Sequence, residues 1–205
     1  MKGILGRKIG MTQVFDPESG QVTPVTVIQA GPCPVVQVKT VETDGYEAVQ
    51  IAYEPVVERK LSKPEVGHLA KAGATPHRHL VELRGQSELQ VGESVTVEAF
   101  EPGEAVKVAG ISIGKGFQGT IKRHNFARGP VSHGSHNVRK PGSIGASATP
   151  ARVFKGQKMA GRMGGKRITQ PGLVIHGVDV EQNLLLVKGS IPGPKSGIVE
   201  IRAAR

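Results

Sequence analysis

One stretch of the sequence limits the possible folds more than any other: residues 114–167 contain 12 Lys or Arg residues and no Asp or Glu. Its central part, residues 125–165, has only eight large apolar side chains and eight glycines among 41 residues. So little apolar surface cannot offset the conformational entropy lost when a segment of this length becomes ordered. We therefore predict that residues 125–165 form an extended basic loop, and that the rest of the chain supplies the hydrophobic core.

The positive charge of the whole chain comes from this same stretch. The chain has 27 Lys and Arg against 17 Asp and Glu, a net charge of +10, but outside residues 114–167 the balance is 15 basic against 17 acidic residues. A basic patch this concentrated is typical of proteins that bind a polyanion such as a nucleic acid. A solvated linker would contain Glu among its polar residues, so the complete lack of acids favours nucleic acid over that alternative.

The remainder of the chain has the residue pattern of β-strands. The Asp44-Gly45 pair between two apolar runs predicts a hairpin with a tight primed turn, and a second turn is expected at residues 17–21. Ser62 and Pro64 predict one short helix over residues 62–74. Strands are expected at residues 9–16, 22–30, 33–43, 46–54, 77–83, 94–100, 105–113, 173–180, 184–191 and 197–204.

This pattern of many short strands with one long excursion predicts a mainly β fold. We expect a small antiparallel β-barrel made of residues 1–124 and 166–205, with a small α+β lobe at about residues 60–100. Residues 125–165 form the long basic RNA-penetrating loop in this prediction. A loop of 41 residues running out and back could reach roughly 65 Å if fully extended at about 3.3 Å per residue.

Several classes of protein are disfavoured by the residues present. Cys33 is the sole cysteine, so no internal disulfide can form, and its position between two prolines indicates a small buried apolar group. The N-terminus has no apolar signal region, and the longest wholly apolar stretch, residues 184–187, is too short to span a bilayer. The pairs His77/His79 and His133/His136 could bind a metal only together with carboxylates or thiols, and none are nearby in the sequence. No spacing suggests a catalytic group, so we expect no enzyme, no cofactor and no metal.

Two glycine-rich motifs resemble nucleotide sites. Residues 114–119, GKGFQG, match G-x-G-x-x-G after a predicted strand, but Gly129 and Pro130 interrupt the segment after the motif, and no acid appears before Asp179. That fingerprint needs a helix and an acidic residue about twenty positions on, so the dinucleotide hypothesis is weak. Residues 163–167 miss a phosphate-binding loop because Ala160 and Arg167 stand where a Gly and a Ser or Thr are needed.

The candidate nucleic-acid contacts are the cations of the basic stretch and its histidines. Lys and Arg neutralise phosphates, and His can stack on unpaired RNA bases. Three N-terminal cations extend this set. The predicted RNA-binding residues are Lys2, Arg7, Lys8, Lys115, Lys122, Arg123, His124, Arg128, His133, His136, Arg139, Lys140, Arg152, Lys155, Lys158, Arg162, Lys166 and Arg167.

Residues 110–123, GISIGKGFQGTIKR, carry a likeness that is more specific than the nucleotide motif within them. So do GRKIGMTQVF at residues 6–15, PGSIGASATPARVFKGQKMAGRMG at 141–164 and NLLLVKGSIPG at 183–193. By these blocks, which extend over nearly the whole length, the sequence resembles the bacterial large-subunit ribosomal protein L3 family.

The resemblance implies a non-enzymatic, architectural ribosomal protein. It implies a β-barrel body on the outer face of the large subunit, and a long loop running through 23S rRNA towards the peptidyl transferase centre. It also implies early binding to that RNA during subunit assembly, neighbouring large-subunit proteins as partners, and a cytoplasmic location without membrane or small-molecule substrate. The part of the loop nearest the catalytic RNA would be Gly142, Ser143, Ile144, Gly145, Ala146, Ser147, Ala148, Thr149 and Pro150.

Three positions depart from the family pattern. Lys107 stands where Asp or Asn is preferred, and His124 where many members have tryptophan. Ala148 replaces a glutamine that many bacterial members have methylated, so that modification is not expected here. The alternatives left open by the residues are a non-ribosomal nucleic-acid chaperone or compacting protein and, more distantly, a nucleotide-binding enzyme.

Overall fold

The computed structural model describes residues 2–17, 20–86 and 88–204 and divides the chain into two compact units. The body consists of Met1–Ser112 and Arg167–Arg205, and the basic unit of Ile113–Lys166. The division separates the nearly neutral part of the sequence from the basic part.

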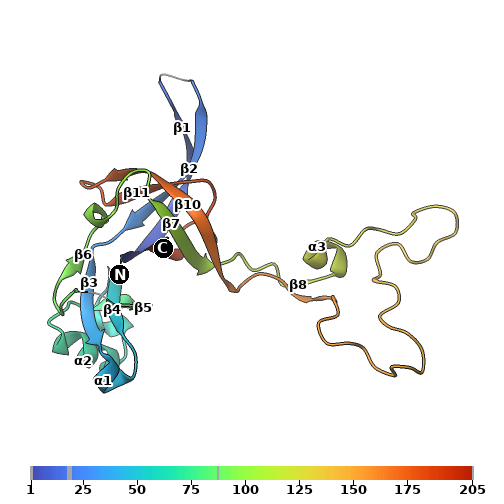
Figure 1. The fold of residues 1–205 in the computed structure, drawn as a ribbon, viewed down its shortest axis with the longest axis horizontal. Helices are drawn as coiled ribbons and strands as arrows, with labels where there is room; N and C mark the ends of the chain where they lie inside the picture. The colour runs from blue at the N-terminus through green and yellow to red at the C-terminus, as the bar shows by residue number, and fades with distance from the viewer. Residues whose placement is uncertain (1, 18–19, 87, 205) are drawn as a thin grey trace. The chain divides into compact units, whose positions relative to one another are not determined.

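A closed barrel of six antiparallel strands forms the centre of the body (Figure 1). Around the barrel the order is β1-β12-β7-β10-β11-β2, so the strand nearest the C-terminus lies between β1 and β7. The predicted mainly β fold with an antiparallel barrel is therefore confirmed. The six strands are β1 (Gly3–Phe15), β2 (Val22–Ala30), β7 (Ala105–Ile111), β10 (Arg167–Asp179), β11 (Leu184–Lys188) and β12 (Ile198–Ala203).

A second antiparallel sheet of the body has the strand order β5-β4-β3-β6. It is built from residues 33–95, a range that overlaps the small lobe expected at about residues 60–100. Two short α-helices and a 3₁₀ turn connect its strands. These elements are β3 (Cys33–Lys39), α1 (Val41–Asp44), β4 (Ala48–Pro55), η1 (Glu58–Lys60), α2 (Lys63–Lys71), β5 (His77–Arg84) and β6 (Ser94–Val95).

One hydrophobic cluster joins the barrel to this sheet. Ile4, Ile28 and Ile201 of the barrel and Val35 and Ile51 of the sheet are all fully buried in it. β-Branched side chains suit the pleated surface of a strand, and burying each such side chain contributes roughly 1.5–3 kcal/mol. The core thus stabilises the barrel and the sheet together, without any contribution from the basic unit.

Gly6 lets β1 and β2 approach closely inside the barrel wall. A Cβ atom at Gly6 would lie 2.7 Å from Ile28 Cγ2 and 2.8 Å from the carbonyl oxygen of Gln29. Both distances are shorter than real contacts allow, so a larger residue would push the two strands apart. Glycine is needed here because of space, since it has no side chain at all.

The local predictions have mixed outcomes. The helix is confirmed as α2, where Ser62 and Glu65 form a reciprocal capping box at its N-terminus. Strands β3 and β4 do form a hairpin across Asp44 and Gly45, but their connection is the helical turn α1, closed by Gly45 with φ of 78°. The predicted primed turn is therefore wrong.

Residues 94–100 also differ from the expected strand. Pairing stops after Ser94–Val95, and a 3₁₀ turn, η2 (Val97–Ala99), follows and buries Val97 in the core. Alternating apolar residues fit both conformations over so short a stretch. The expected turn at residues 17–21 includes Glu18 and Ser19, which lie outside the described residues.

The two strands that lead to and from the basic unit are neighbours in the barrel. β7 and β10 pair antiparallel, and Arg167 lies opposite Ile111. In topological terms the basic unit therefore replaces the short turn of a β-hairpin. Because β7 and β10 pair with each other, any connection that joins their ends, long or short, is compatible with the barrel.

We predict that replacing residues 112–166 by Asn-Gly leaves a folded body. Asn-Gly is a favourable two-residue hairpin turn. Shortening the connection from about 55 residues to two lowers the entropic cost of closing the loop. This should stabilise the body by up to about 3 kcal/mol. Urea unfolding of both proteins measures this. Loss of the cooperative transition in the shortened protein would show instead that the body depends on the basic unit.

Candidate nucleic-acid interface

The two ends of the basic unit are held together by a short antiparallel ladder. β8 (Phe117–Gln118) pairs with β9 (Gly161–Arg162). Next to this pair, the amide of Lys115 donates to the carbonyl of Met163 and the amide of Met163 donates to the carbonyl of Gly116, both at 2.9 Å. Residues from opposite ends of the unit are thus fixed side by side by backbone hydrogen bonds.

A one-turn helix, α3 (Thr120–His124), follows β8 and ends at Asn125, which has φ of 58°. Its last residues anchor the returning chain: Arg123 Nη1 donates to the carbonyl oxygen of Met159 at 2.6 Å, and His124 Nε2 lies 2.9 Å from the same oxygen. Two of the predicted RNA-binding side chains therefore also hold the unit's own backbone. The helix follows the GKGFQG motif but has only five residues, too short for a dinucleotide site.

Residues 125–160 contain no helix or strand. Their internal hydrogen bonds are few: the amide of Gly129 donates to the carbonyl of Val138 at 2.9 Å, and Ser143 Oγ donates to the carbonyl of Gly145 at 2.8 Å. Across Ile113–Lys166, all of which the structure describes, Thr120 alone is buried. Ile113–Lys166 therefore has no hydrophobic core of its own.

Most cations of the basic unit point into solvent. The unit contains no acidic residue, so none of its cations has an acidic partner within it. Long cationic side chains in this situation create a positive field and attract phosphate. The exposed cations are Lys115, Lys122, Arg128, Arg139, Lys140, Arg152, Lys155, Lys158, Arg162 and Lys166, and His133 and His136 are exposed as well.

Exposed apolar rings accompany these cations. Phe117 and Phe154 are exposed, and the guanidinium carbon of Arg152 lies 5.6 Å from the ring centre of Phe154. Flat aromatic and guanidinium groups are the surfaces on which unpaired bases stack. In the predicted loop tip, residues 142–149 are exposed and Pro150 is half-buried, so that segment is open to a partner.

The four predicted residues that belong to the body have partners there. Lys2 Nζ lies 2.6 Å from Glu104 Oε2, Arg7 Nη2 lies 2.5 Å from Glu54 Oε1, and Arg167 Nη2 lies 2.5 Å from Glu200 Oε2. Lys8 is buried, and its Nζ donates to the carbonyl oxygens of Ile191 and Gly193 at 3.1 and 3.2 Å. Burial also lowers the pKa of Lys8. All four side chains therefore have partners within the body.

Two cations of the barrel, Lys107 and Arg202, were not among the RNA-binding residues predicted from the sequence. Lys107 and Arg202 lie opposite each other on β7 and β12, and with Arg167, Thr169 and Glu200 they line a cavity of about 220 Å³. The buried Glu200 carboxylate is paired with both Arg167 and Arg202. The sequence pattern of β12 could have indicated this pairing. Glu200 and Arg202 alternate with the buried Val199 and Ile201, so both lie on the outer face of the strand.

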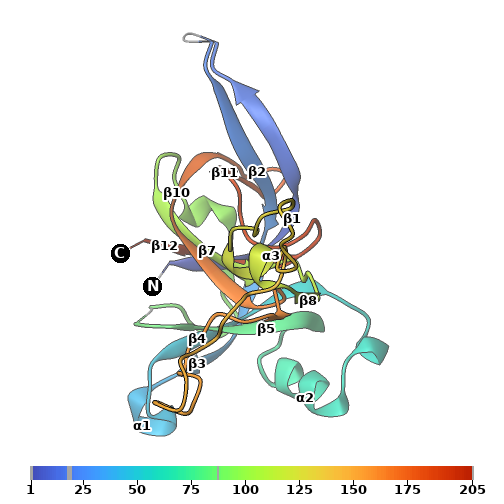
Figure 2. The same ribbon diagram turned by 90° about the vertical axis from the view of Figure 1, so that its right-hand side faces the viewer.

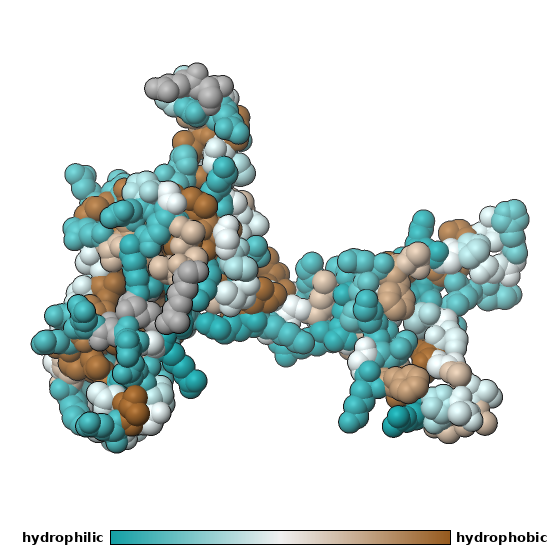
Figure 3. Space-filling model, in the orientation of Figure 1, coloured by the Kyte–Doolittle hydropathy of each residue, from teal (hydrophilic) through white to brown (hydrophobic). Residues whose placement is uncertain are grey.

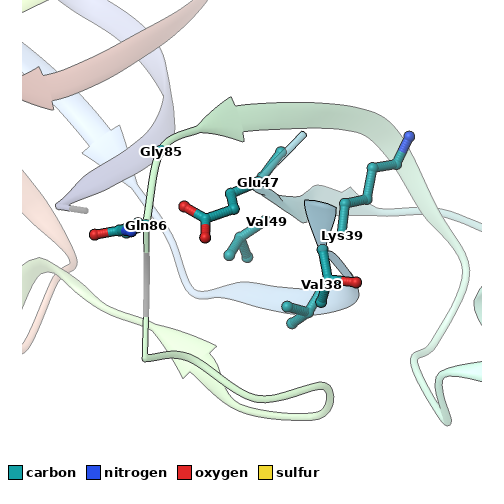
Figure 4. A pocket seen from close by; sticks show the side chains of 8 residues that line it. Val38, Lys39, Glu47, Val49, Gly85 and Gln86 are labelled. Atoms are coloured by element: carbon teal, nitrogen blue, oxygen red, sulfur yellow. The ribbon is translucent and has the colours of Figure 1, made fainter. Parts of the chain in front are cut away.

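Two further features of the body bear on its chemistry. The cavity of about 300 Å³ in Figure 4 is lined by Lys39, Glu47, Gln86 and apolar residues of β3 and β4. Cys33 is fully buried as predicted, and burial raises its pKa to about 12, so it is not an activated thiol. In residues 2–17, 20–86 and 88–204, no group of three His, Cys, Asp or Glu could hold a metal, and no helix is long and apolar enough to cross a membrane.

Comparisons with known proteins identify the family. A family model described as ribosomal protein L3 matches residues 86–179. The large ribosomal subunit protein uL3 of Streptomyces coelicolor is 56% identical over 207 residues, which cover all of this chain and 96% of that protein. The chain belongs to the ribosomal protein L3 family. The uL3 proteins of Synechococcus elongatus and Clavibacter sepedonicus are 57% and 58% identical and cover 98% of the chain, over 95% and 94% of their own lengths.

Membership of the L3 family confirms the resemblance seen in the sequence blocks. The family consists of ribosomal proteins, so the prediction that this chain is no enzyme holds. The G-x-G-x-x-G match at residues 114–119 is accordingly part of an L3 sequence block, and the nucleotide-binding alternative is dropped.

The base of the basic unit in this L3 chain depends on one glycine. Gly164 has φ of 69°, and a Cβ there would lie 2.0 Å from the carbonyl oxygen of Ile113. We predict that Gly164→Ala breaks the adjoining ladder, so the Lys115 and Met163 amides exchange hydrogen faster. Gly156→Ala is the matched control, because Gly156 also has a positive φ but nothing within 4 Å. Equal effects of both substitutions on these two amides would contradict the prediction.

The Arg7–Glu54 pair gives a pH-dependent prediction. The hydrogen bond from Arg7 lowers the pKa of the Glu54 carboxyl. A lowered folded-state pKa contributes stability above the unfolded value of about 4.3, and that contribution is lost as the pH falls through the folded pKa. Glu54→Gln should therefore destabilise by about 0.5–1 kcal/mol at pH 7 and by nearly nothing at pH 3 in urea unfolding. The exposed Glu88→Gln is the control, and a Glu54→Gln effect independent of pH would refute this role.

Proposed function

We propose that this chain is an architectural constituent of the bacterial large ribosomal subunit and binds 23S rRNA through its basic unit. The observation that carries the proposal is the set of ten exposed Lys and Arg side chains on a unit with no acid and no hydrophobic core. The curated relatives are named as large ribosomal subunit proteins, which supports this role and a place in the cytoplasmic ribosome.

The mechanism would be scaffolding by charge and shape. Each Lys or Arg that neutralises a phosphate releases condensed counterions, which favours binding without any reading of base sequence. A segment with few internal hydrogen bonds can follow the RNA surface closely, and its glycines add no side-chain bulk. Ordering such a segment costs conformational entropy, which the RNA contacts must offset.

The finer roles rest on the resemblance. By it, residues 142–150 approach the peptidyl transferase centre and support the RNA there, and early binding of the chain helps to nucleate subunit assembly. Their exposure, apart from the half-buried Pro150, is compatible with a close RNA partner. Neighbouring large-subunit proteins would contact the body, where several cations already have acidic partners.

The alternative is a nucleic-acid chaperone or compacting protein outside the ribosome. The exposed cations alone would suit it, because phosphate contacts position a protein on any nucleic acid without selecting sequence. The two functions predict different preferences between folded rRNA and duplex DNA. A ribosomal constituent should bind folded 23S rRNA better than duplex DNA at the same salt concentration, whereas a chaperone or compactor should bind both equally.

We predict that affinity for 23S rRNA falls with salt because of the basic unit. If about half of the basic residues contact phosphate, log affinity against log salt should have a slope of magnitude roughly 4–5. Reversing two exposed cations, Lys155→Glu with Arg162→Glu, should weaken binding and reduce that magnitude by roughly 1.5. Filter binding between about 50 and 200 mM salt measures both values.

The matched control is Arg59→Glu with Lys60→Glu, which makes the same charge change at two exposed positions of the body. It should leave the slope unchanged, and the free proteins should all melt alike. A slope of log affinity against log salt near zero would contradict the proposal. Equal losses in both double variants would mean that net charge, rather than the basic unit, drives binding, and equal affinity for duplex DNA would favour the chaperone.

A further inference from the structure

The outer part of the β1–β2 hairpin lacks the neighbours that its inner part has. β12 pairs with β1 over Gly3–Arg7, and β11 pairs with β2 over residues 25–29. Residues 10–15 of β1 pair with residues 22–27 of β2, and toward the tip the described parts of these two strands pair only with each other (Figure 2). Both strands there have a free sheet edge, which proteins normally cover or protect.

One face of this hairpin carries three large exposed apolar side chains, with the polar Gln13 between them. Directly opposite residues of antiparallel strands share a face, and the register places Phe15 opposite Val22, Gln13 opposite Pro24 and Met11 opposite Thr26. Met11, Phe15 and Val22 are 50%, 61% and 48% exposed. We call Met11, Phe15, Val22 and Pro24 the hairpin strip. In Figure 3 hydrophobic residues are visible along this hairpin.

The hairpin strip lacks the positive charge of an RNA-binding surface. Residues 9–38 contain no Lys, Arg or His, and their only charges are Asp16 and Glu18. Two cations lie at the base of the hairpin, where Lys188 pairs with Val25 and the Lys195 side chain lies beside Gly10. Surfaces that bind RNA are strongly positive because phosphate dominates the interaction. This segment has apolar side chains and acids but no cation of its own.

We propose that the hairpin strip binds another protein of the large subunit, one that presents apolar side chains flanked by Lys or Arg. The inference rests on the proposed function, because it places the chain in that subunit. A protein that itself binds rRNA is basic for the same electrostatic reason as this one. The exposed Asp16 next to Phe15 complements such a partner, and the strip's apolar side chains would be removed from water by it.

A photoreactive residue tests the nature of the partner. Phe15 is replaced by p-benzoylphenylalanine, and purified large subunits containing the variant are irradiated. The expected product resists ribonuclease, and mass spectrometry of it finds a peptide of a different subunit protein with Lys or Arg close to the linked residue. Phe154, exposed in the basic unit, is replaced in the same way as the control and should give a ribonuclease-sensitive product.

The other possible results contradict either the docking inference alone or the proposed function as well. A link from position 15 to RNA, to a second copy of this chain, or to nothing while position 154 links to RNA would overturn the docking inference and leave the proposed function standing. Absence of the variant chains from large subunits, although both proteins fold, would overturn the proposed function and this inference with it.

Substitution gives a second measurement. Phe15→Ser with Met11→Ser changes two exposed side chains, so the melting of the free protein and its salt-dependent affinity for 23S rRNA should stay unchanged. The amount of the cross-linked neighbour in purified large subunits should fall several-fold. Unchanged occupancy of that neighbour would show that the hairpin strip does not hold it.

Discussion

The antiparallel pairing of β7 with β10 is the constraint on which the rest of the structure depends. These strands are neighbours in the barrel, and Arg167 lies opposite Ile111 where the basic unit leaves and rejoins the body. A long connection between paired strands costs little more entropy than a moderate one, because the loop-closure term grows only with the logarithm of length. The barrel can therefore tolerate the insertion of a basic unit, Ile113–Lys166, that buries almost nothing.

The two units are stabilised by different kinds of interaction. In the body, hydrophobic burial dominates, and cations such as Arg7 and Arg167 are paired with carboxylates. In the basic unit the hydrogen bonds of Arg123 and the β8–β9 ladder fix only the base, and the cations beyond it have no acid within the unit. All the acids and nearly all the buried apolar side chains are thus in the body, whereas the basic unit has cations without acids.

Sequence reasoning predicted the features that depend on local composition. The barrel class and helix α2 follow from residues close together in the chain, such as Ser62 with Pro64. It missed features set by distant residues. That Lys8 binds the carbonyl of Ile191, or that Glu200 joins Arg167 to Arg202, depends on strand register across the barrel. The α1 turn was missed because Gly45 adopts positive φ in a helix end as readily as in a primed turn.

The place of β12 between β1 and β7 has a consequence for the order of events during synthesis. Translation produces the strands from the N-terminus, so β1 and β7 exist long before Ile198–Ala203, the strand that joins them. Until then β1 and β7 have no strand between them, so the sheet is open and its contacts with β12 cannot form. The entire basic unit has already been made by that stage. The segment that attracts polyanions thus precedes, in time, the closed body to which it belongs.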